Sequence, residues 1–226
     1  MPKLIASILL FLLSTGRISP ERSGKVVPSV PGCREWYAEM NLERWVDYAA
    51  FEQACEGYRK IPGKRKEILT LIDYTKPSTE ERLVVLDMKR RKVLFSSCVS
   101  QGRNSGGNYA VSFSNENGSH KSSLGFFLTE NTYRGKNGYS LVLEGLEKGI
   151  NDRARERAIV IHGAPYSDPA VIAGGGRLGR SLGCPALPPK LAAPIIDAIR
   201  GGSLLYIYGN DRDYPHRSPV LSGNAV

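Results

Sequence analysis

The sequence predicts a mostly-β domain with an N-terminal helical appendage and one helix near the C-terminal end. Short segments rich in Val, Leu and Ile recur between about residues 68 and 208, and such segments are typical of strands. Turn-forming residues are frequent, with 24 glycines and 14 prolines in 226 residues, which favours many turns and several long loops. The length suits one ordinary domain with a short appendage.

The helical appendage is predicted over residues 35–64. Leu42, Trp45 and Val46 recur at offsets of three and four, which is the spacing of one helical face. A Pro-Gly turn at 62–63 stops the pattern. We expect one long helix or two short ones, whose apolar face packs on the main domain.

The main domain is predicted over residues 65–210. Short apolar segments predict strands at 68–74, 82–88, 92–99, 124–129, 139–143, 158–161 and 203–208. A tight basic turn around 89–91 joins the second and third of them into a hairpin. The stretch KLAAPIIDAIR at 190–200 predicts a helix that ends before a Gly-Gly pair. Residues 211–226 are expected to form a polar tail.

A long polar segment, from Ser100 to Ser123, interrupts the strands. Loops of this length inside a compact domain are usually functional or disordered. The sequence leaves both possibilities open for this segment.

The first residues have the pattern of a secretory signal. Lys3 precedes an apolar run from Leu4 to Leu13, and small residues follow. The run is shorter than the roughly 20 residues that span a membrane. We expect a signal peptide at 1–16, a flexible leader at 17–34 and export across the cytoplasmic membrane. An uncleaved segment would instead hold the protein at the membrane.

The chain is basic, with a formal net charge of +9 and a pI near 9.4. A basic surface attracts polyanions such as nucleic acid, anionic lipid or an anionic cell wall. The Lys and Arg residues are scattered along the chain, and no nucleic-acid motif accompanies them. We therefore expect no nucleic-acid partner, while attraction to an anionic matrix stays open.

Four cysteines are present, Cys33, Cys55, Cys98 and Cys184. Their spacings contain no CxxC pair, so the sequence predicts no zinc site and no other metal. Cys33 and Cys55 are the conceivable disulfide partners in an oxidising compartment, but the sequence does not decide whether they pair.

Two segments have the residue types of a nucleophilic enzyme. His162 ends the apolar run IVIHG, and Cys184 follows the glycine-punctuated turn GRSLGC. Gly183 would let the backbone bend so that amide N–H groups point at a reacting carbonyl oxygen. A neighbouring imidazole is what makes a thiol reactive near neutral pH. Either residue alone is more often structural, but together they indicate a Cys-His enzyme with Cys184 as nucleophile and His162 as base.

The same residues resemble the signature of the murein L,D-transpeptidase catalytic domain family. That signature is a His-Gly strand end followed by a Ser-x-Gly-Cys turn, here His162-Gly163 and the turn 181–184. The segments GRNSGGNYAVSFSN, GSHKSSLGF and RERAIVIHGA are also similar to one branch of the family. The resemblance covers roughly residues 68–208. It implies a β-rich, YkuD-like catalytic fold whose Gly125 strand borders the active site.

Two positions depart from the wider family. Leu182 stands where a second His is usual, and Ala186 stands where an Arg is often found. Arg180 or Arg177 would then bind a substrate carboxylate, because a guanidinium suits that geometry, unless both are solvated loop charges.

Further candidates lie around the two motifs. His120 lines the site or is an ordinary loop residue, and Gly163 is a candidate for substrate contact beside the base. Ser181 is one candidate for orienting His162, with a backbone carbonyl as the alternative. His216 in the polar tail is not expected to take part.

The resemblance implies a reaction on peptidoglycan stem peptides in the periplasm or cell wall. His162 takes the Cys184 proton, and the thiolate attacks the amide before the D-Ala of a tetrapeptide stem. Backbone N–H groups at Gly183 and Cys184 stabilise the oxyanion, D-alanine leaves, and a thioester remains. An amine acceptor makes the enzyme an L,D-transpeptidase. No metal or organic cofactor is needed.

Two alternatives stay open. Water as the acceptor would make the protein an L,D-carboxypeptidase, and the same scaffold could serve a non-catalytic cell-wall-binding protein. Retention of both His162 and Cys184 argues against the second. The oligomeric state is not predicted.

Overall fold

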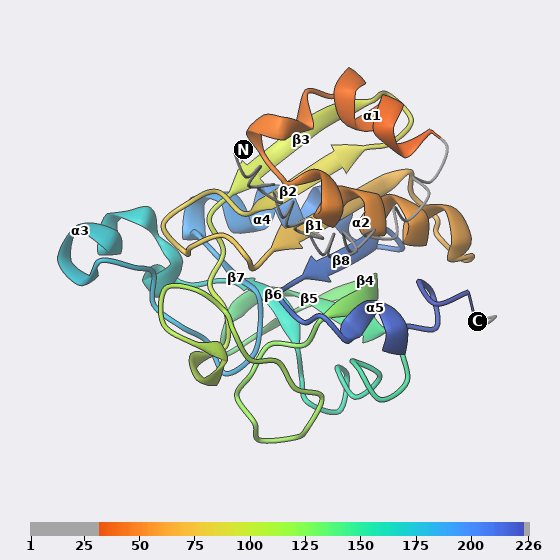
Figure 1. Cartoon of the computed structure of the whole chain (residues 1–226). Helices are drawn as coiled ribbons and strands as arrows, with labels where there is room; N and C mark the ends of the chain where they lie inside the picture. Colours follow the sequence, from red (N-terminus) through yellow and green to blue (C-terminus); the bar gives the residue numbers. More distant parts are fainter. Residues whose placement is uncertain (1–31, 224–226) are drawn as a thin grey trace, which may run out of the picture.

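A computed structural model describes residues 32–223 of the chain. The predicted signal peptide at 1–16 and most of the leader at 17–34 lie outside the described residues. The described chain forms one sheet with helices packed against it (Figure 1).

The sheet has eight strands in the order β3-β2-β1-β8-β4-β5-β6-β7. The strands are β1 (Ile68–Asp73), β2 (Leu83–Asp87), β3 (Lys92–Ser97), β4 (Gly125–Gly135), β5 (Gly138–Gly145), β6 (Val160–Gly163), β7 (Ala186–Leu187) and β8 (Leu204–Tyr208). All seven predicted strands are present, and the predicted β-rich fold class is confirmed. The sheet also contains a two-residue strand, β7, that the sequence did not predict.

Strand pairing places β8 at the centre of the sheet. It runs parallel to β1 and antiparallel to β4. The predicted hairpin of β2 and β3 is confirmed. β4 continues beyond the predicted end at residue 129, because residues up to Gly135 pair with β5 in a hairpin that ends at Gly138. The extension is largely exposed, so its polar residues are compatible with a strand.

The helical appendage consists of two helices, α1 (Cys33–Glu39) and α2 (Tyr48–Lys60), with a short 3-10 turn (Leu42–Arg44) between them. Asn41 takes a left-handed conformation with φ of 50°, and this breaks the continuous helix that the periodicity also allowed. Helix α2 packs against β1 and β8, whereas α4 (Pro189–Ile199), the predicted C-terminal helix, packs against β5 and β6. None of the helices between residues 32 and 223 is long and apolar enough to cross a membrane.

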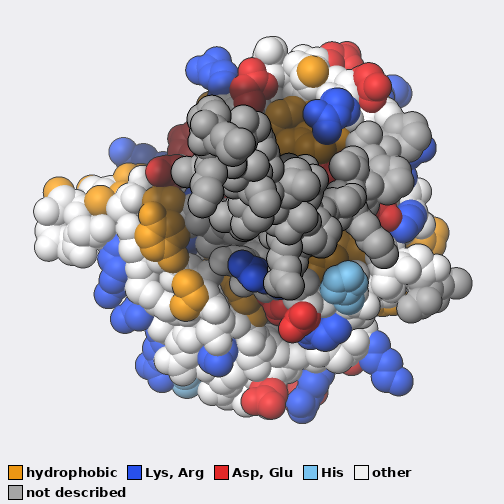
Figure 2. Space-filling model, viewed as in Figure 1, with side chains coloured by type: hydrophobic (Ala, Val, Ile, Leu, Met, Phe, Trp, Pro, Cys, Tyr) orange, Lys and Arg blue, Asp and Glu red, His pale blue; other side chains and the backbone are white. Residues whose placement is uncertain are grey.

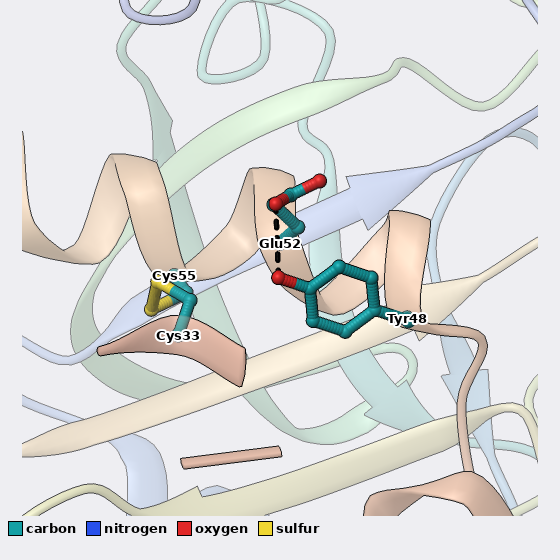
Figure 3. The surroundings of a disulfide bond; sticks show 4 residues. All are labelled: Cys33, Tyr48, Glu52 and Cys55. Carbon is teal, nitrogen blue, oxygen red and sulfur yellow. Dashed lines mark hydrogen bonds between the residues drawn. A yellow bond between two sulfur atoms is a disulfide. The ribbon is translucent and has the colours of Figure 1, made fainter. Parts of the chain in front are cut away.

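A disulfide joins Cys33 of α1 to Cys55 of α2 (Figure 3). Both cysteines are fully buried. On the same side of α2, the Tyr48 hydroxyl donates to the Glu52 carboxylate at 2.9 Å. Cys98 and Cys184 are free thiols. The structure therefore decides the pairing that the sequence left open.

The C-terminal segment expected as a polar tail contains a short helix, α5 (Tyr214–Arg217). Tyr214 and Val220 are buried. The Tyr214 and Ser218 hydroxyls both donate to the buried carboxylate of Glu147. Burial raises the pKa of Glu147, and these donors act in the opposite direction. The segment is polar in composition, yet these contacts fix it to the domain.

The remaining short elements lie in loops. They are α3 (Ile172–Gly175), which projects from the domain in Figure 1, and 3-10 turns at Arg103–Ser105, Pro165–Ser167 and Pro169–Val171. Lys and Arg side chains are spread around the face shown in Figure 2, with acidic groups between them.

Gly57 of α2 allows the helix to lie directly on Phe126 of β4. A Cβ at this position would lie 2.1 Å from the Phe126 ring. Alanine usually stabilises a helix relative to glycine by about 0.5–1 kcal/mol. We expect Gly57→Ala to destabilise this protein instead, by about 1–3 kcal/mol, because the added methyl overpacks the core.

Urea unfolding measures this change as a lower midpoint at an unchanged slope. In the double variant Gly57→Ala with Phe126→Leu, the smaller side chain relieves the contact. The combined loss should therefore be smaller than the sum of the two single losses. A Gly57→Ala protein more stable than wild type would contradict the packing described here.

Candidate active site

His162 lies on β6, between β5 and β7. Its backbone is opposite Ser140 on one side and Ala186 on the other. The side chain is only 4% exposed. Its Nδ1 lies 3.0 Å from the carbonyl oxygen of Gly163, and because a carbonyl only accepts, Nδ1 carries the proton. The other ring nitrogen, Nε2, is then the one with a free lone pair.

Burial lowers the pKa of His162, and the hydrogen bond to Gly163 acts in the opposite direction. A lowered pKa means that the imidazole is uncharged near neutral pH. An uncharged imidazole can accept a proton, so the environment of His162 suits a general base.

Cys184 lies two residues before Ala186, the β7 residue opposite His162. The parallel pairing of β6 with β7 therefore brings the turn that carries Cys184 close to the strand that carries His162. Cys184 is half-buried, and its Sγ lies 3.6 Å from the Ala158 carbonyl oxygen. Within residues 32–223, no hydrogen bond joins this Sγ to the His162 ring.

Burial raises the pKa of the Cys184 thiol, and the Val160 amide and the Arg157 guanidinium partly oppose that rise. The resting thiol is therefore protonated at neutral pH. A protonated thiol must give its proton to a base before it can attack a carbonyl.

The turn before Cys184 is fixed by Ser181. The Ser181 hydroxyl donates to the Cys184 carbonyl oxygen at 2.6 Å and accepts from the Gly183 amide at 3.1 Å. Ser181 therefore braces the turn, and the carbonyl of Gly163 is the group that orients His162. Gly183 has a φ of 129°, and a Cβ there would lie 3.0 Å from the Lys121 carbonyl oxygen, so the turn requires glycine.

The two amides predicted to bind an oxyanion differ in their surroundings. The Gly183 amide donates to Ser181, whereas the Cys184 amide lies beside its own sulfur. The backbone amides of Val160 and Cys184 both act to lower the pKa of the thiol. The part played by Gly183 in this structure is conformational.

The long polar segment at 100–123 packs across the turn at 181–184. Ser100 pairs with Ala186, and Gly102 pairs with Ser181. The Ser122 hydroxyl accepts from the Gly102 amide at 3.0 Å and donates to the Gly183 carbonyl oxygen at 3.2 Å. The segment is thus an ordered wall of the site. The resemblance placed the Gly125 strand beside the active site. Ser122, which precedes this strand, makes the contact with the turn.

Beyond Gly125, that strand enters the core. Phe126 stacks on Tyr206 with ring centroids 4.3 Å apart. A Cβ at Gly125 would lie 2.0 Å from the Glu147 carboxylate. These residues support the sheet behind the site.

The predicted substrate-binding residues fall into two groups. Arg180 donates to the carbonyl oxygens of Arg103 and Gly106, both at 3.0 Å. His120 lies 2.9 Å from the Arg103 guanidinium. Arg180 and His120 therefore converge on one short stretch of the polar segment. Arg177, by contrast, donates to the neighbouring Leu178 carbonyl.

Gly163, the candidate for substrate contact beside the base, has close neighbours of its own. A Cβ at Gly163 would lie 2.9 Å from the Ala192 side chain of α4. The glycine therefore allows α4 to approach β6, and its carbonyl holds His162.

Three groups near the thiol were not predicted from the sequence. Tyr74 and Tyr166 interact electrostatically with Cys184, and burial raises the pKa of each phenol to about 12. Both phenols are therefore neutral at neutral pH. The third group is Arg157, which belongs to the segment RERAIVIHGA that carries the family resemblance. No sequence signal marks the two tyrosines. Residues 32–223 contain no group of three or more His, Cys, Asp and Glu that could hold a metal.

A cysteine just before one strand and a neutral, carbonyl-oriented imidazole on the strand paired with it are the residue types that a thiolate-nucleophile enzyme needs. The model of the L,D-transpeptidase catalytic domain family matches residues 42–208. The chain belongs to this family, whose members act on peptidoglycan peptides. The match includes α2, which the sequence assigned to the appendage.

Two solved structures are similar to this chain at low sequence identity. The L,D-transpeptidase from Mycobacterium smegmatis is 16% identical, with a TM-score of 0.39 over 63% of this chain and 59% of the other. The helical cell shape determining protein Pgp2 from Campylobacter jejuni is 14% identical, with a TM-score of 0.44 over 71% and 55%. The chain thus spans between half and two thirds of the length of these proteins. A search of curated proteins finds no significant match.

Proposed function

We propose that this protein is an exported L,D-transpeptidase that uses Cys184 as its nucleophile and His162 as its base. The observation that supports this most directly is the pairing of β6 with β7, which sets a buried, Nδ1-protonated imidazole beside the strand that follows the cysteine. Membership of the L,D-transpeptidase family gives the class of substrate.

The reaction starts with transfer of the Cys184 thiol proton to Nε2 of His162. The thiolate attacks the carbonyl carbon of the amide before the terminal D-Ala. The Cys184 amide donates to the oxyanion that forms. The C–N bond then breaks, the imidazolium returns its proton to the leaving amine, and a thioester remains on Sγ.

An amine of a second stem peptide opens the thioester. His162 takes a proton from the attacking amine, the C–S bond breaks, and the departing thiolate is reprotonated by the imidazolium. The products are a new amide and the resting enzyme. Water in place of the amine would give a shortened stem, which is the L,D-carboxypeptidase reaction.

Arg180 and His120 are proposed to bind the carboxylates of the stem peptide. One nitrogen of Arg180 is occupied by two backbone carbonyls, so the guanidinium is held at a fixed place beside the nucleophile turn. Its remaining N–H groups can bind a carboxylate. Arg177 and Gly163 are weaker candidates. Arg177 donates to the adjacent Leu178 carbonyl, and Gly163 packs against Ala192 of α4.

Action outside the cytoplasmic membrane is part of this proposal. The Cys33–Cys55 disulfide supports it, because disulfides persist in oxidising compartments. The apolar run after Lys3 supports export as well. The net charge of +9 would favour attraction to an anionic cell wall.

Mass spectrometry of protein incubated with a disaccharide-tetrapeptide tests the function. Wild type should release D-alanine, form a thioester on Cys184 and yield a cross-linked dimer. Cys184→Ala should do none of these, whereas Cys98→Ala, which removes the other free thiol, should retain all three. A shortened stem without cross-links would identify a carboxypeptidase. Binding of the substrate with no thioester and no product would point to a wall-binding protein.

A further inference from the structure

Arg157 lies between the polar segment and the nucleophile turn. Its two terminal nitrogens donate to the Ser114 and Lys121 carbonyls and to the Ser119 and Ser123 hydroxyls, at 2.5–3.2 Å. One arginine therefore connects four residues of the segment at 114–123. The side chain is half-buried, and these hydrogen bonds are partly buried.

The positive charge of Arg157 has no acidic partner within residues 32–223. Its two closest basic neighbours in sequence differ in this respect. Arg153 pairs with Glu156, and Arg155 pairs with Glu130 and Glu144. All partners of Arg157 are neutral oxygens, and a guanidinium remains charged in proteins. The charge at this position is therefore uncompensated.

The guanidinium lies next to the nucleophile turn. A Cβ at Gly183 would lie 3.5 Å from Nη2 of Arg157. The other titratable groups around the thiol are His162, Tyr74 and Tyr166, and each of them is neutral near pH 7. Arg157 is thus the cation that faces Cys184 from the described chain, and it acts to lower the pKa of the thiol against the effect of burial.

We infer that Arg157 is a positioning residue that fastens the polar segment over the Gly183–Cys184 turn and holds an unpaired positive charge beside the Cys184 thiolate. The inference rests on the proposed role of Cys184 as nucleophile, but the effect on the thiolate requires no substrate. The acyl-transfer reaction depends on the same thiolate, so the residue would affect reactivity toward a stem peptide as well.

The test measures the rate of alkylation of Cys184 by iodoacetamide as a function of pH, with the modified peptide identified by mass spectrometry. Arg157→Gln keeps hydrogen-bond donors and removes the charge, whereas Arg157→Lys keeps the charge. Arg155→Gln is the matched control, because it removes one nearby charge that contacts neither the polar segment nor the turn. We expect the pH midpoint of Cys184 alkylation to rise by about one pH unit in Arg157→Gln. In Arg157→Lys and Arg155→Gln the midpoint should stay near that of wild type.

An unchanged midpoint in Arg157→Gln would overturn the inference, and so would an equal rise in Arg155→Gln. If Arg157→Gln does not fold by circular dichroism, Ser119→Ala and Ser123→Ala loosen the guanidinium one contact at a time. They should also raise the midpoint, and no rise in either would again overturn it. A wild type that alkylates as expected but leaves peptidoglycan unchanged would contradict the proposed function and leave the role of Arg157 intact.

Discussion

The His162→Gln variant is expected to lose about 10²- to 10⁴-fold in kcat/KM for the tetrapeptide donor, which is the usual contribution of a general base. Glutamine keeps a polar side chain of similar reach, but its amide does not take up a proton near neutral pH. The Cys184 thiol, whose pKa is raised by burial, would then remain protonated and unreactive.

The pH dependence of wild type follows from the direction of the His162 shift. Burial lowers the pKa of this imidazole, so the base stays neutral to a pH below its ordinary value of about 6.5. Activity should therefore fall on the acidic side only below that pH. As the pH drops through the lowered pKa, the ring takes up a proton and the base is lost.

The matched control is His216→Gln, since His216 is exposed on α5. This variant should retain the wild-type rate and pH profile. Initial rates of D-alanine release at several pH values measure both effects. Full activity of His162→Gln, or an acidic limb above pH 6.5 in wild type, would contradict the assignment of His162 as base.

Removal of the Cys33–Cys55 disulfide should give the largest change in stability. The bridge closes a loop with a sequence separation of 22, and a cross-link of this length contributes about 3 kcal/mol. For a domain of this size, such a loss lowers Tm by about 6–12 °C. The double variant Cys33→Ala with Cys55→Ala carries this change.

Thermal unfolding with and without a thiol reductant measures the effect. Wild type in reductant should approach the Tm of the double variant, and the double variant should not respond to reductant. At temperatures below both transitions, kcat/KM should stay at the wild-type value, because the bridge joins α1 to α2 and neither helix carries a site residue. A reductant-insensitive wild type would show that the bridge contributes nothing.

The parts of the fold that the sequence predicted are those with local signals. Strands such as β2 and β8 are short apolar runs between turns, and they are buried along most of their length. The helix at 190–200 has an apolar face and a glycine stop, and the structure places it at Pro189–Ile199. β7 was missed because two residues are too few to show any period.

In the candidate site too, the sequence predicted the residues with local motifs and missed the contacts between distant segments. His162 and Cys184 stand in recognisable local motifs, so the sequence indicated them. The hydrogen bond from Ser122 to Gly183, the orientation of His162 by Gly163 and the contacts of Arg157 depend on segments that meet only in the folded chain. Period and composition carry no information about such contacts.

The central place of β8 has a consequence for the order of folding. Leu69 of β1 is opposite Leu204 of β8, and β8 also pairs with β4. Until residues 204–208 have been synthesised, the strands before β8 form two separate groups with unpaired edges, and the strand that carries His162 belongs to the second group. Pairings between such distant segments form slowly. A chain in which β4 has formed but β8 has not therefore exposes two sheet edges, which makes that stage the one most open to aggregation or proteolysis.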